Sequence, residues 1–475
     1  MRRVRRVLAI AVCSAAALVG VSGSGAISTA RTDVTLTASD GVKLRATLVE
    51  PTAPGTYPAI LMLHGLAGKR QDILPLADQF AAAGYVVLAP DIRGHGESGG
   101  LLSVDGPREI QDVRELVDWL RARPEVNGGI GGWGISLGGG AILRAAVEGI
   151  PFAALETLQT WTNFYSALAP QNLSKSGALY QLLHSVPAER TAPEVLDIAS
   201  RAIQSKDRPA LRAFAAARSS AQLLPQLATP LYMFQGRRDF IFDIAQATTA
   251  MRVVKGPHRL YVGDFGHSPS TFPGPDIGIV MARGLAWFNR YLKAAPAAPG
   301  PSAELAPDPW RGSPAALPPT KRVGFALHGT KTIGAKGVVV RSTRTRSALE
   351  TFGAGSVRAR VRLRGGWLRV VAVVVARRGR SDTVVSEGGV NTAGLRGRRT
   401  LTIRLIDTAT LIPRGSRLRV YIAATSQKQD PSNLLYLDLG LPRGARLTVG
   451  SGSLRLSVLR KAVSRYNSRA KTASH

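Results

Sequence analysis

The sequence has almost no cysteine, few acidic residues and no apolar run long enough to cross a membrane. Its one cysteine, Cys13, lies in the apolar N-terminal segment, which excludes a disulfide scaffold and a cysteine-based metal site. Acidic residues number 31 against 62 lysines and arginines, so the formal net charge is +31. Apolar residues at 45% and charged residues at 20% are an ordinary globular composition, which excludes a disordered or fibrous chain.

The N-terminus has the features of an export signal. Residues 1–6 are basic, residues 7–21 are apolar, and small residues suited to cleavage precede Ala26 and Ala30. The apolar stretch of about 15 residues is shorter than the ~20 that a membrane anchor needs. We therefore expect residues 1–30 to be a signal peptide and the mature chain to be secreted or held in the cell envelope.

The basic charge is concentrated in the second part of the chain. Residues 301–475 hold 32 lysines and arginines against 8 acidic residues, a net +24 that leaves +7 for residues 1–300. No nucleic-acid partner is expected, because the chain carries an export signal and few aromatic residues stand among the arginines to stack on bases.

Hydrophobic periodicity divides the rest of the chain into two regions. Residues 31–293 alternate between short apolar strands and amphipathic helices, which predicts a mostly parallel sheet covered on both faces. Between two of these strands, residues 157 to about 226 show only helical patterns and are expected to form a cap. The segment 294–320 contains eight prolines in 27 residues and is expected to be a linker. Residues 321–460 contain short strands at regular spacing, typical of a β-sandwich or jelly roll, and a polar tail follows at 461–475.

A nucleophile motif stands between a predicted strand and a predicted helix. Gly134-Ile-Ser-Leu-Gly138 matches the G-x-S-x-G pattern, which places a serine on a sharp turn where larger residues than glycine clash. The turn aims the Ser136 hydroxyl at the N-terminus of the following helix, where developing negative charge is stabilised. Ser136 is therefore the predicted nucleophile.

The base and the acid are expected to follow the serine along the chain. Asp239 comes directly after the next-to-last predicted strand, and His267 comes after the last. We predict that His267 takes the proton of Ser136 and that Asp239 orients the imidazole. Asp243 and Asp264 are the alternative acids.

A tetrahedral intermediate needs two preorganised hydrogen-bond donors. We predict the backbone N–H groups of Leu137, which follows the nucleophile, and of Leu66 in the loop His64-Gly65-Leu66-Ala67-Gly68. His64 itself is expected to shape this loop rather than to react.

Several stretches resemble the α/β-hydrolases of the X-Pro dipeptidyl-peptidase and cocaine-esterase (CocE/NonD-type) group. The matching stretches are Ser39-Asp-Gly-Val-Lys-Leu44, Asp91-Ile-Arg-Gly-His-Gly-Glu-Ser98, Asp118-Trp-Leu120, Gly132-Trp-Gly-Ile-Ser-Leu-Gly138, Gly263-Asp-Phe-Gly-His267, Trp287-Phe-Asn-Arg-Tyr-Leu292 and Leu411-Ile-Pro-Arg-Gly-Ser-Arg-Leu-Arg-Val420. The resemblance implies a doubly wound, mostly parallel α/β-hydrolase sheet with a helical cap, followed by an all-β jelly-roll domain. It also implies a serine hydrolase of ester, amide or peptide bonds that uses no metal or cofactor.

The sequence departs from this group at the oxyanion loop. The group often has tyrosines there and after the nucleophile, whereas this chain has the His64-Gly65-Leu66 pattern of general esterases and lipases, and Leu137. A general carboxylesterase or lipase-like enzyme therefore stays an alternative, as does a non-catalytic cell-envelope-binding protein on a hydrolase fold.

Two sets of residues bear on the substrate. Trp161, Phe164 and Tyr165 stand where the cap begins, and either line an apolar substrate pocket or form the core of the cap. Members of the group that accept a free α-amino group present carboxylates near the pocket. The candidates in this sequence, each also readable as a solvated helix charge, are Glu156, Glu189, Glu194, Asp197 and Asp207.

One strongly basic strand is predicted in the C-terminal region. Arg358, Arg360, Arg362 and Arg364 alternate with apolar residues and therefore share one face of a sheet. They form either a solvated outer face or a surface that attracts an anionic cell-envelope polymer or lipid. The adjacent run Trp367–Ala376 is too continuously apolar for a half-exposed strand, so we expect it to be buried on both faces against the catalytic region.

Overall fold

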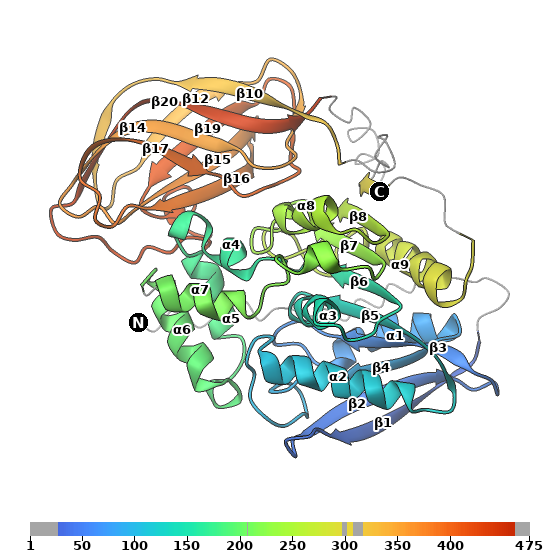
Figure 1. Cartoon of the computed structure of the whole chain (residues 1–475). Coiled ribbons are helices and arrows are strands. Elements are labelled where there is room, and N and C mark those ends of the chain that lie inside the picture. The colour runs from blue at the N-terminus through green and yellow to red at the C-terminus, as the bar shows by residue number, and fades with distance from the viewer. Residues whose placement is uncertain (1–26, 207, 297–301, 307–316, 461–475) are drawn as a thin grey trace.

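The computed structural model describes residues 27–206, 208–296, 302–306 and 317–460. Residues 1–26 of the predicted signal peptide 1–30 and the predicted polar tail 461–475 lie outside these residues. Figure 1 shows an α/β region at the lower right and an all-β region at the upper left, with a group of helices between them on one side.

The α/β region is built on a nine-stranded sheet with the order β1-β2-β4-β3-β5-β6-β7-β8-β9. Strands β1 and β2 are antiparallel to their neighbours, and every other pair is parallel. The strands are β1 (Thr29–Thr37), β2 (Lys43–Pro51), β3 (Tyr57–Leu63), β4 (Val86–Pro90), β5 (Val126–Ile135), β6 (Ala154–Leu158), β7 (Leu231–Gly236), β8 (His258–Gly263) and β9 (Ala303–Leu305).

Helices cover both faces of this sheet, as its apolar central strands require. Apolar side chains of α1 (Arg70–Ala82) and α9 (Ile277–Leu292) meet one face. Those of α2 (Pro107–Arg121), α3 (Leu137–Val147) and α8 (Ile244–Val253) meet the other. The predicted doubly wound α/β-hydrolase arrangement is confirmed.

The segment between β6 and β7 is helical in the structure. Its helices are α4 (Phe164–Leu168), α5 (Ser176–Leu183), α6 (Pro193–Ile203) and α7 (Arg208–Ala216). They lie beside the carboxyl end of the sheet and beneath the all-β region in Figure 1. The proline-rich segment contains one element that the sequence did not suggest, because β9 joins the main sheet beside β8.

The C-terminal region is a sandwich of antiparallel sheets, here called the β domain (residues 320–460). One sheet has the order β10-β20-β14-β17 with β11 beside β20, and the other has the order β12-β19-β15-β16. The strands are β10 (Thr320–Leu327), β11 (Lys331–Gly334), β12 (Val339–Arg344), β13 (Leu349–Glu350), β14 (Ser356–Arg364), β15 (Arg369–Arg378), β16 (Ser381–Asn391), β17 (Gly397–Arg404), β18 (Leu411–Ile412), β19 (Arg417–Ala423) and β20 (Arg446–Leu459). The expected all-β domain after the hydrolase fold is confirmed.

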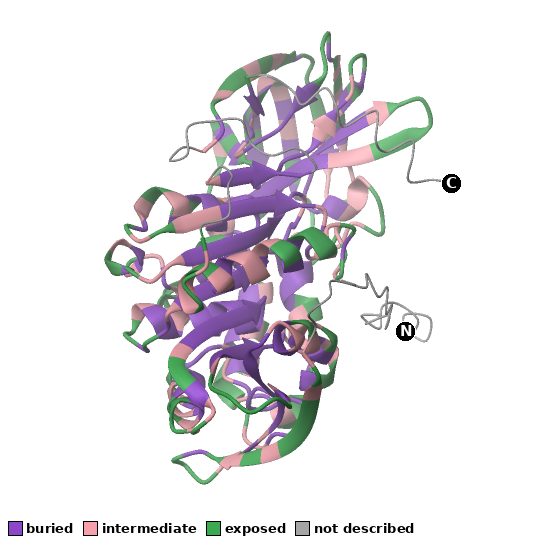
Figure 2. Cartoon of the chain, turned by 90° about the vertical axis from the view of Figure 1, so that its right-hand side faces the viewer, coloured by how far each residue is buried: buried purple, intermediate pink, exposed green. Residues whose placement is uncertain are grey.

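Strand β15 joins the two regions through both of its faces. Val370, Ala372 and Val374 lie in the core between the two β sheets, whereas Val371 and Val373 lie in the apolar core that extends from the α/β region. Every residue from Arg369 to Ala376 is buried, as the continuous apolar run Trp367–Ala376 predicts, whereas Leu368 within that run is 37% exposed. Figure 2 shows the largely buried strands of both regions in purple.

Candidate active site

Ser136 occupies the turn between β5 and α3 and has a left-handed backbone, with φ 53° and ψ −113°. This conformation is unfavourable for a non-glycine residue. A Cβ atom at position 134 would lie 2.3 Å from the carbonyl oxygen of Gly138, and one at position 138 would lie 2.3 Å from the carbonyl oxygen of Leu63. The two glycines of the motif therefore allow the turn to close tightly around the serine.

Three side chains from the ends of β5, β7 and β8 meet at this turn. Ser136 Oγ lies 3.0 Å from Nε2 of His267, and His267 Nδ1 lies 2.6 Å from Oδ2 of Asp239. An ionised carboxylate only accepts hydrogen bonds, so Nδ1–H donates to Asp239 and Nε2 is left to accept from the serine hydroxyl. The structure thus brings Ser136, His267 and Asp239 together in the order that nucleophilic catalysis requires.

The Asp239 carboxylate is held from both sides. Its Oδ1 accepts hydrogen bonds from the backbone N–H groups of Ile241 at 3.0 Å and Phe242 at 2.8 Å. Its Oδ2 also accepts from the backbone N–H of His267 at 3.1 Å. Asp239 is 1% exposed, so both oxygens have fixed partners away from water.

The alternative acids have other partners. Asp243 Oδ1 accepts from the N–H of Ala245 at the start of α8, and its Oδ2 accepts from the N–H of Asp407 at 3.0 Å. The backbone N–H of Asp264 donates to Asp276 Oδ2 at 2.7 Å. Of the three candidates, only Asp239 has a described contact with the imidazole.

The loop after β3 lies directly against the nucleophile. A Cβ atom at Gly65 would lie 3.4 Å from Cβ of Ser136, and the carbonyl of His64 accepts a hydrogen bond from the N–H of Gly138 at 3.1 Å. Within the described part of the chain, the N–H of Leu66 donates no hydrogen bond. The N–H of Leu137 is the first of helix α3, a position that lacks an intrahelical acceptor. The N–H groups of Leu66 and Leu137 stay the predicted oxyanion donors, one in a loop that lies against Ser136 and one in the residue that follows it.

His64 supports this loop from inside the protein. Its Nε2 accepts a hydrogen bond from the N–H of Ile92 at 3.0 Å, and its Nδ1 lies 2.7 Å from the carbonyl oxygen of Gly65. The ring is 1% exposed, and burial lowers the pKa of His64. A neutral imidazole with a hydrogen bond at each ring nitrogen shapes the loop rather than exchanging protons with a substrate.

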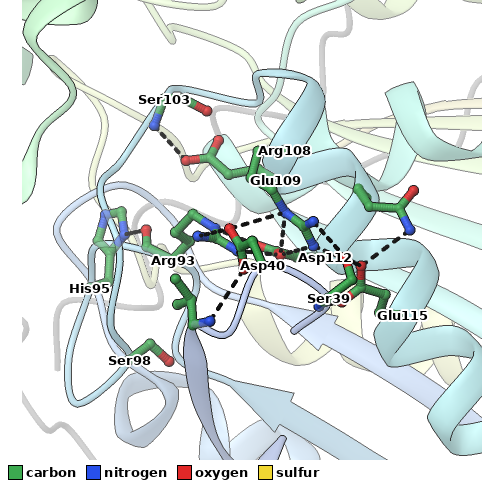
Figure 3. A network of polar contacts seen from close by, with 12 residues as sticks. Ser39, Asp40, Arg93, His95, Ser98, Ser103, Arg108, Glu109, Asp112 and Glu115 are labelled. Atoms are coloured by element: carbon green, nitrogen blue, oxygen red, sulfur yellow. Dashed lines mark hydrogen bonds and ion pairs between the residues drawn. The ribbon is translucent and has the colours of Figure 1, made fainter. Parts of the chain in front are cut away.

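A charged network fixes the segment that contains Ile92 (Figure 3). Nε of Arg93 donates to Asp112 on α2 at 2.7 Å, and its guanidinium also pairs with Asp40 in the β1–β2 turn at 2.9 Å. Burial by itself would raise the pKa of Glu115, but hydrogen bonds from Ser39 and Arg108 lower it to about 2. These contacts connect the first hairpin and α2 to the segment that orients His64.

The three aromatic residues at the start of the cap differ in their positions. Trp161 is 2% exposed, and its ring centroid lies 4.7 Å from that of Phe164 and 4.9 Å from that of Phe242. The Phe242 ring meets His267 edge-on at 5.2 Å. Tyr165 is half-buried, with its hydroxyl donating to Asn172 at 2.9 Å. Trp161 and Phe164 thus belong to the apolar core that reaches the His267 ring through Phe242, whereas Tyr165 lies at its border.

The carboxylates considered for an α-amino group differ in their surroundings. Glu156 is not a solvated helix charge, because it lies on β6 with 0% exposure against Gly284 of α9. Burial raises its pKa well above the usual range. Glu194 pairs with Arg218 at 3.2 Å, Asp197 pairs with Arg201, and Glu189 lies in an exposed turn. Asp207 lies outside the described residues.

Two buried basic residues near the site were not predicted from the sequence. Lys175 is 0% exposed, and its Nζ donates to the carbonyl of Ile241 at 2.8 Å. Arg237, two residues before Asp239, is 3% exposed and bonds to the β domain. A charged residue directly after an apolar strand is a weak hint for Arg237. Nothing in the cap pattern marks Lys175.

Neither a metal cluster nor a membrane-spanning helix is found among residues 27–206, 208–296, 302–306 and 317–460. No three histidine, cysteine, aspartate or glutamate side chains gather there as a possible metal site. Within the same residues, no helix combines the length and hydropathy needed to cross a bilayer.

Residues 40–269 match the family model described as X-Pro dipeptidyl-peptidase (S15 family). The predicted resemblance is confirmed. The matched region begins in the β1–β2 turn and ends two residues after His267, so it includes all three residues of the candidate triad.

Solved structures extend the likeness across both regions. A CocE/NonD family hydrolase from Staphylococcus aureus has a TM-score of 0.71 and 14% identity, covering 91% of this chain and 94% of that one. An α-amino acid ester hydrolase has a TM-score of 0.66 and 14% identity, covering 93% and 98%. At these identities the likeness establishes the shared fold, including the β domain.

Curated relatives match over shorter stretches. The quorum-quenching protein AidA of Acinetobacter baumannii is 32% identical over 143 residues, which are 28% of this chain and 45% of that protein. The chain spans about half or less of the length of the curated relatives it matches. Residues 40–269 are therefore similar to the X-Pro dipeptidyl-peptidase family, and the solved structures share the fold of both regions.

Proposed function

We propose that the chain is an exported serine hydrolase that cleaves an ester, amide or peptide bond through an acyl-enzyme on Ser136. The observation that carries the proposal is the chain of contacts from Ser136 Oγ through the His267 ring to Asp239, with lengths of 3.0 and 2.6 Å. The match of residues 40–269 to the X-Pro dipeptidyl-peptidase family supports the same reaction class.

In this reaction His267 Nε2 takes the proton of the Ser136 hydroxyl while Oγ attacks the substrate carbonyl carbon. The resulting oxyanion accepts hydrogen bonds from the N–H groups of Leu66 and Leu137, and Asp239 stabilises the imidazolium. When the intermediate collapses, His267 returns the proton to the leaving alcohol or amine and Ser136 stays acylated. Water then attacks the acyl-enzyme, again with His267 as base, and releases the acid.

A fluorophosphonate probe tests this proposal directly. We expect the wild-type chain to be labelled and the Ser136→Ala variant not to be labelled. No labelling of the wild type, or equal labelling of both, would exclude the serine-hydrolase mechanism and favour a non-catalytic envelope-binding protein on this fold.

Two substrate classes remain to be separated by turnover. Dipeptide release by X-Pro peptidases requires recognition of a free α-amino group, yet of the described carboxylates considered for that role Glu156 is buried, Glu194 and Asp197 are paired with arginines, and Glu189 faces solvent. The apolar group of Trp161, Phe164 and Phe242 beside His267 favours an uncharged acyl group. We therefore expect faster hydrolysis of short p-nitrophenyl esters than of Xaa-Pro-p-nitroanilides, and the reverse ranking would assign the peptidase activity.

Export is part of the proposal and has a structural consequence. Strand β1 begins at Thr29 and pairs with β2 along its whole length. Cleavage after Ala26 leaves this strand whole, whereas cleavage after Ala30 removes its first two residues. We expect N-terminal sequencing of the secreted protein to start at Ile27.

We also propose that the outer face of the β domain binds an anionic polymer of the cell envelope. Arg358, Arg360, Arg362 and Arg364 are exposed and alternate with buried apolar residues of β14. In the sheet register, Arg362 lies opposite Arg398 and Arg364 lies opposite Arg446. Like charges directly opposite each other destabilise a sheet, so this arrangement favours a polyanionic partner.

Chemistry favours a polymer over a membrane. Arginines two residues apart on a strand lie about 6.6 Å apart, which suits repeated phosphate, sulfate or carboxylate groups bound by guanidinium forks. Among the described residues of the four strands β10, β20, β14 and β17, none is an exposed large apolar residue that would insert into lipid.

The test compares two fourfold variants of Arg358, Arg360, Arg362 and Arg364. The arginine-to-glutamine variant is expected to bind dextran sulfate at least about 10-fold more weakly at low salt, since each lost contact removes a charge-assisted bond. The arginine-to-lysine variant keeps the charge and most of the salt-sensitive attraction. Equal binding by the glutamine variant would exclude this face, and preferential binding to anionic vesicles would assign a lipid partner.

A further inference from the structure

The segment that carries the candidate acid lies against the β domain. This segment, Gly236–Asp243, is here called the acid loop, and it connects β7 to α8. Its contacts reach residues more than a hundred positions further along the chain. Each contact can therefore transmit the position of the β domain to Asp239.

Arg237 makes the most contacts of this kind. Its backbone carbonyl accepts a hydrogen bond from the N–H of Ala409, and its Nε donates to the carbonyl of the same residue, both at 2.9 Å. Its guanidinium also donates to Glu350 of β13 and to the carbonyl of Ala306. Arg237 and Glu350 are 3% and 1% exposed. A buried ion pair of this kind strongly disfavours the loss of either partner.

Two further residues of the acid loop bond to the β domain. The Arg238 guanidinium donates to the carbonyl of Val384 on β16 at 3.1 Å. At the other end of the loop, Asp243 Oδ2 accepts from the N–H of Asp407 at 3.0 Å. The β domain thus holds the acid loop both before and after Asp239.

Lys175 fixes the middle of the acid loop from the cap. Its Nζ donates to the carbonyl of Ile241 at 2.8 Å, and the N–H of the same peptide group, which belongs to Phe242, donates to Asp239 Oδ1 at 2.8 Å. Burial lowers the pKa of Lys175, and the carboxylates of Asp243, Asp239, Glu387 and Asp407 act in the opposite direction. A cation in this position is therefore surrounded by acidic groups from the acid loop and the β domain.

The residues next to Lys175 are themselves bound to the β domain. Ser176 Oγ accepts a hydrogen bond from the N–H of Leu437 at 2.9 Å, and the N–H of Gly177 donates to the carbonyl of Leu435 at 3.1 Å. A Cβ atom at Gly177 would lie 1.4 Å from the carbonyl oxygen of Leu434, so only glycine allows this approach. The start of α5, the acid loop and the β domain meet at Lys175.

We propose that the β domain is a working part of the hydrolase, and that Lys175 is a positioning residue that keeps the acid loop, and through it Asp239, aligned with His267. This inference rests on the proposed function of Ser136, Asp239 and His267. Lys175 touches neither the substrate nor the reacting atoms, and it acts through the peptide group that holds the Asp239 carboxylate. Arg238 acts on the same loop from the β domain.

The experiment is a double-mutant cycle on the full-length chain. Lys175→Met removes the hydrogen-bond donor while keeping the length of the side chain. We expect it to lower kcat for a p-nitrophenyl ester about 10- to 100-fold with little change in KM, because a displaced catalytic group costs rate rather than substrate binding. In an Asp239→Asn background the same substitution should change kcat by less than about threefold, because its effect passes through Asp239.

Matched controls separate positioning from loss of stability. Lys293→Met removes an exposed lysine that donates to the carbonyl of Ala83, away from the acid loop. Arg369→Met removes a buried arginine that donates to the carbonyls of Ala424 and Gly440 within the β domain. Both controls are expected to lower Tm without changing kcat of the folded protein, measured well below Tm.

Arg238→Met provides a second test that does not empty a fully buried site, because this residue is only half-buried. It should show the same dependence on Asp239 with a smaller loss of kcat. Equal losses of kcat in both backgrounds, or folded Lys175→Met and Arg238→Met variants with wild-type kcat, would overturn the inference. Failure of the proposed function is distinguished because the wild-type chain would then not be labelled by the fluorophosphonate probe.

Discussion

The two regions of this protein divide chemistry and charge between them. Residues 1–300 have a net charge of +7 and contain Ser136, Asp239 and His267, whereas residues 301–475 have a net charge of +24. The four alternating arginines of β14 lie on the exposed face of one sheet of the β domain, and strand β15 of the other sheet is buried against the α/β region. The β domain therefore has an apolar side toward the catalytic region and a cationic side toward solvent.

This difference does not make the regions independent. The apolar core of the α/β region includes Val371, Val373 and Val375 of β15, and the acid loop bonds to Ala409 and Asp407 of the β domain. The β domain supplies none of the reacting atoms, yet it contacts the acid loop on both sides of Asp239, the residue that orients His267. Substitutions in the catalytic region and removal of the β domain therefore distinguish the roles of the two regions.

The largest effect is expected at the nucleophile. Ser136→Ala removes the attacking oxygen, and activity should fall by about six orders of magnitude. Tm should rise or stay unchanged. Ser136 is held at a strained φ of 53°, and alanine has the same backbone freedom as serine, so the substitution adds no backbone strain. Ester turnover and calorimetry measure the two quantities. Ser185→Ala in the cap is the matched control, and an active Ser136→Ala variant would contradict the assignment.

The next largest effect concerns the acid. Asp239→Asn should lower kcat by about three to four orders of magnitude, because an amide no longer favours the tautomer with a proton on Nδ1. Asp264→Asn should lower it by less than about 10-fold, and Asp243→Asn should lower Tm because an amide has one acceptor oxygen for the two N–H groups of Ala245 and Asp407. Steady-state kinetics of the three variants rank the acids. A crippled Asp264→Asn variant beside an active Asp239→Asn variant would reverse the assignment.

Removal of the β domain tests whether the catalytic region can stand alone. A fragment of residues 31–314 exposes the apolar surface that β15 covers and loses every β-domain contact of the acid loop, so we expect it to aggregate. Its soluble part should label with fluorophosphonate much more slowly than the whole chain. Size-exclusion chromatography and labelling rates give the answer. A soluble, fully active fragment would show that the β domain is an independent module.

Local pattern was sufficient for most of the fold. Alternating apolar residues predicted β14 as Val357–Arg364, and the structure has Ser356–Arg364. The apolar run Trp367–Ala376 predicted a doubly buried strand, and Arg369–Ala376 are buried. Strand β9 was missed because three residues within a proline-rich segment carry no periodicity, and only pairing with β8 makes them a strand.

The site divides in the same way between local and distant contributions. The nucleophile turn and the chain order of acid and base are local signals, so Ser136, Asp239 and His267 were available from the sequence. Lys175 was not, because its role depends on Ile241, 66 residues away, and on acidic groups of the β domain. Glu156 was misread because a carboxylate in an apolar strand looks like a surface charge until α9 covers it.

The smallest expected effect lies in the pH dependence of stability at the contact between the regions. Glu387 of β16 is 1% exposed, and burial raises its pKa to about 8, against opposing effects of Asn433 and Lys175. Burial likewise raises the pKa of Asp407 to about 7, and it raises the pKa of Asp243. Above about pH 4.5 these carboxyl groups lose their protons in the unfolded chain, whereas in the folded chain they keep them up to a higher pH. Stability from Glu387 is fully present at low pH and is lost as the pH rises toward about 8.

Glu387→Gln keeps the shape and the hydrogen bond to Asn433 but cannot titrate. Between pH 5 and 8 the free energy of unfolding of the wild type should fall by at most about 1.4 kcal/mol per pH unit for this group. In the Glu387→Gln variant the free energy of unfolding should fall less steeply with pH, and the remaining slope should come from Asp407. Denaturant unfolding at several pH values measures the slopes, and Glu189→Gln in an exposed turn is the control. Identical slopes for the wild type and Glu387→Gln would mean that Glu387 is already ionised in the folded chain, so that the contact between the regions does not weaken as the pH rises.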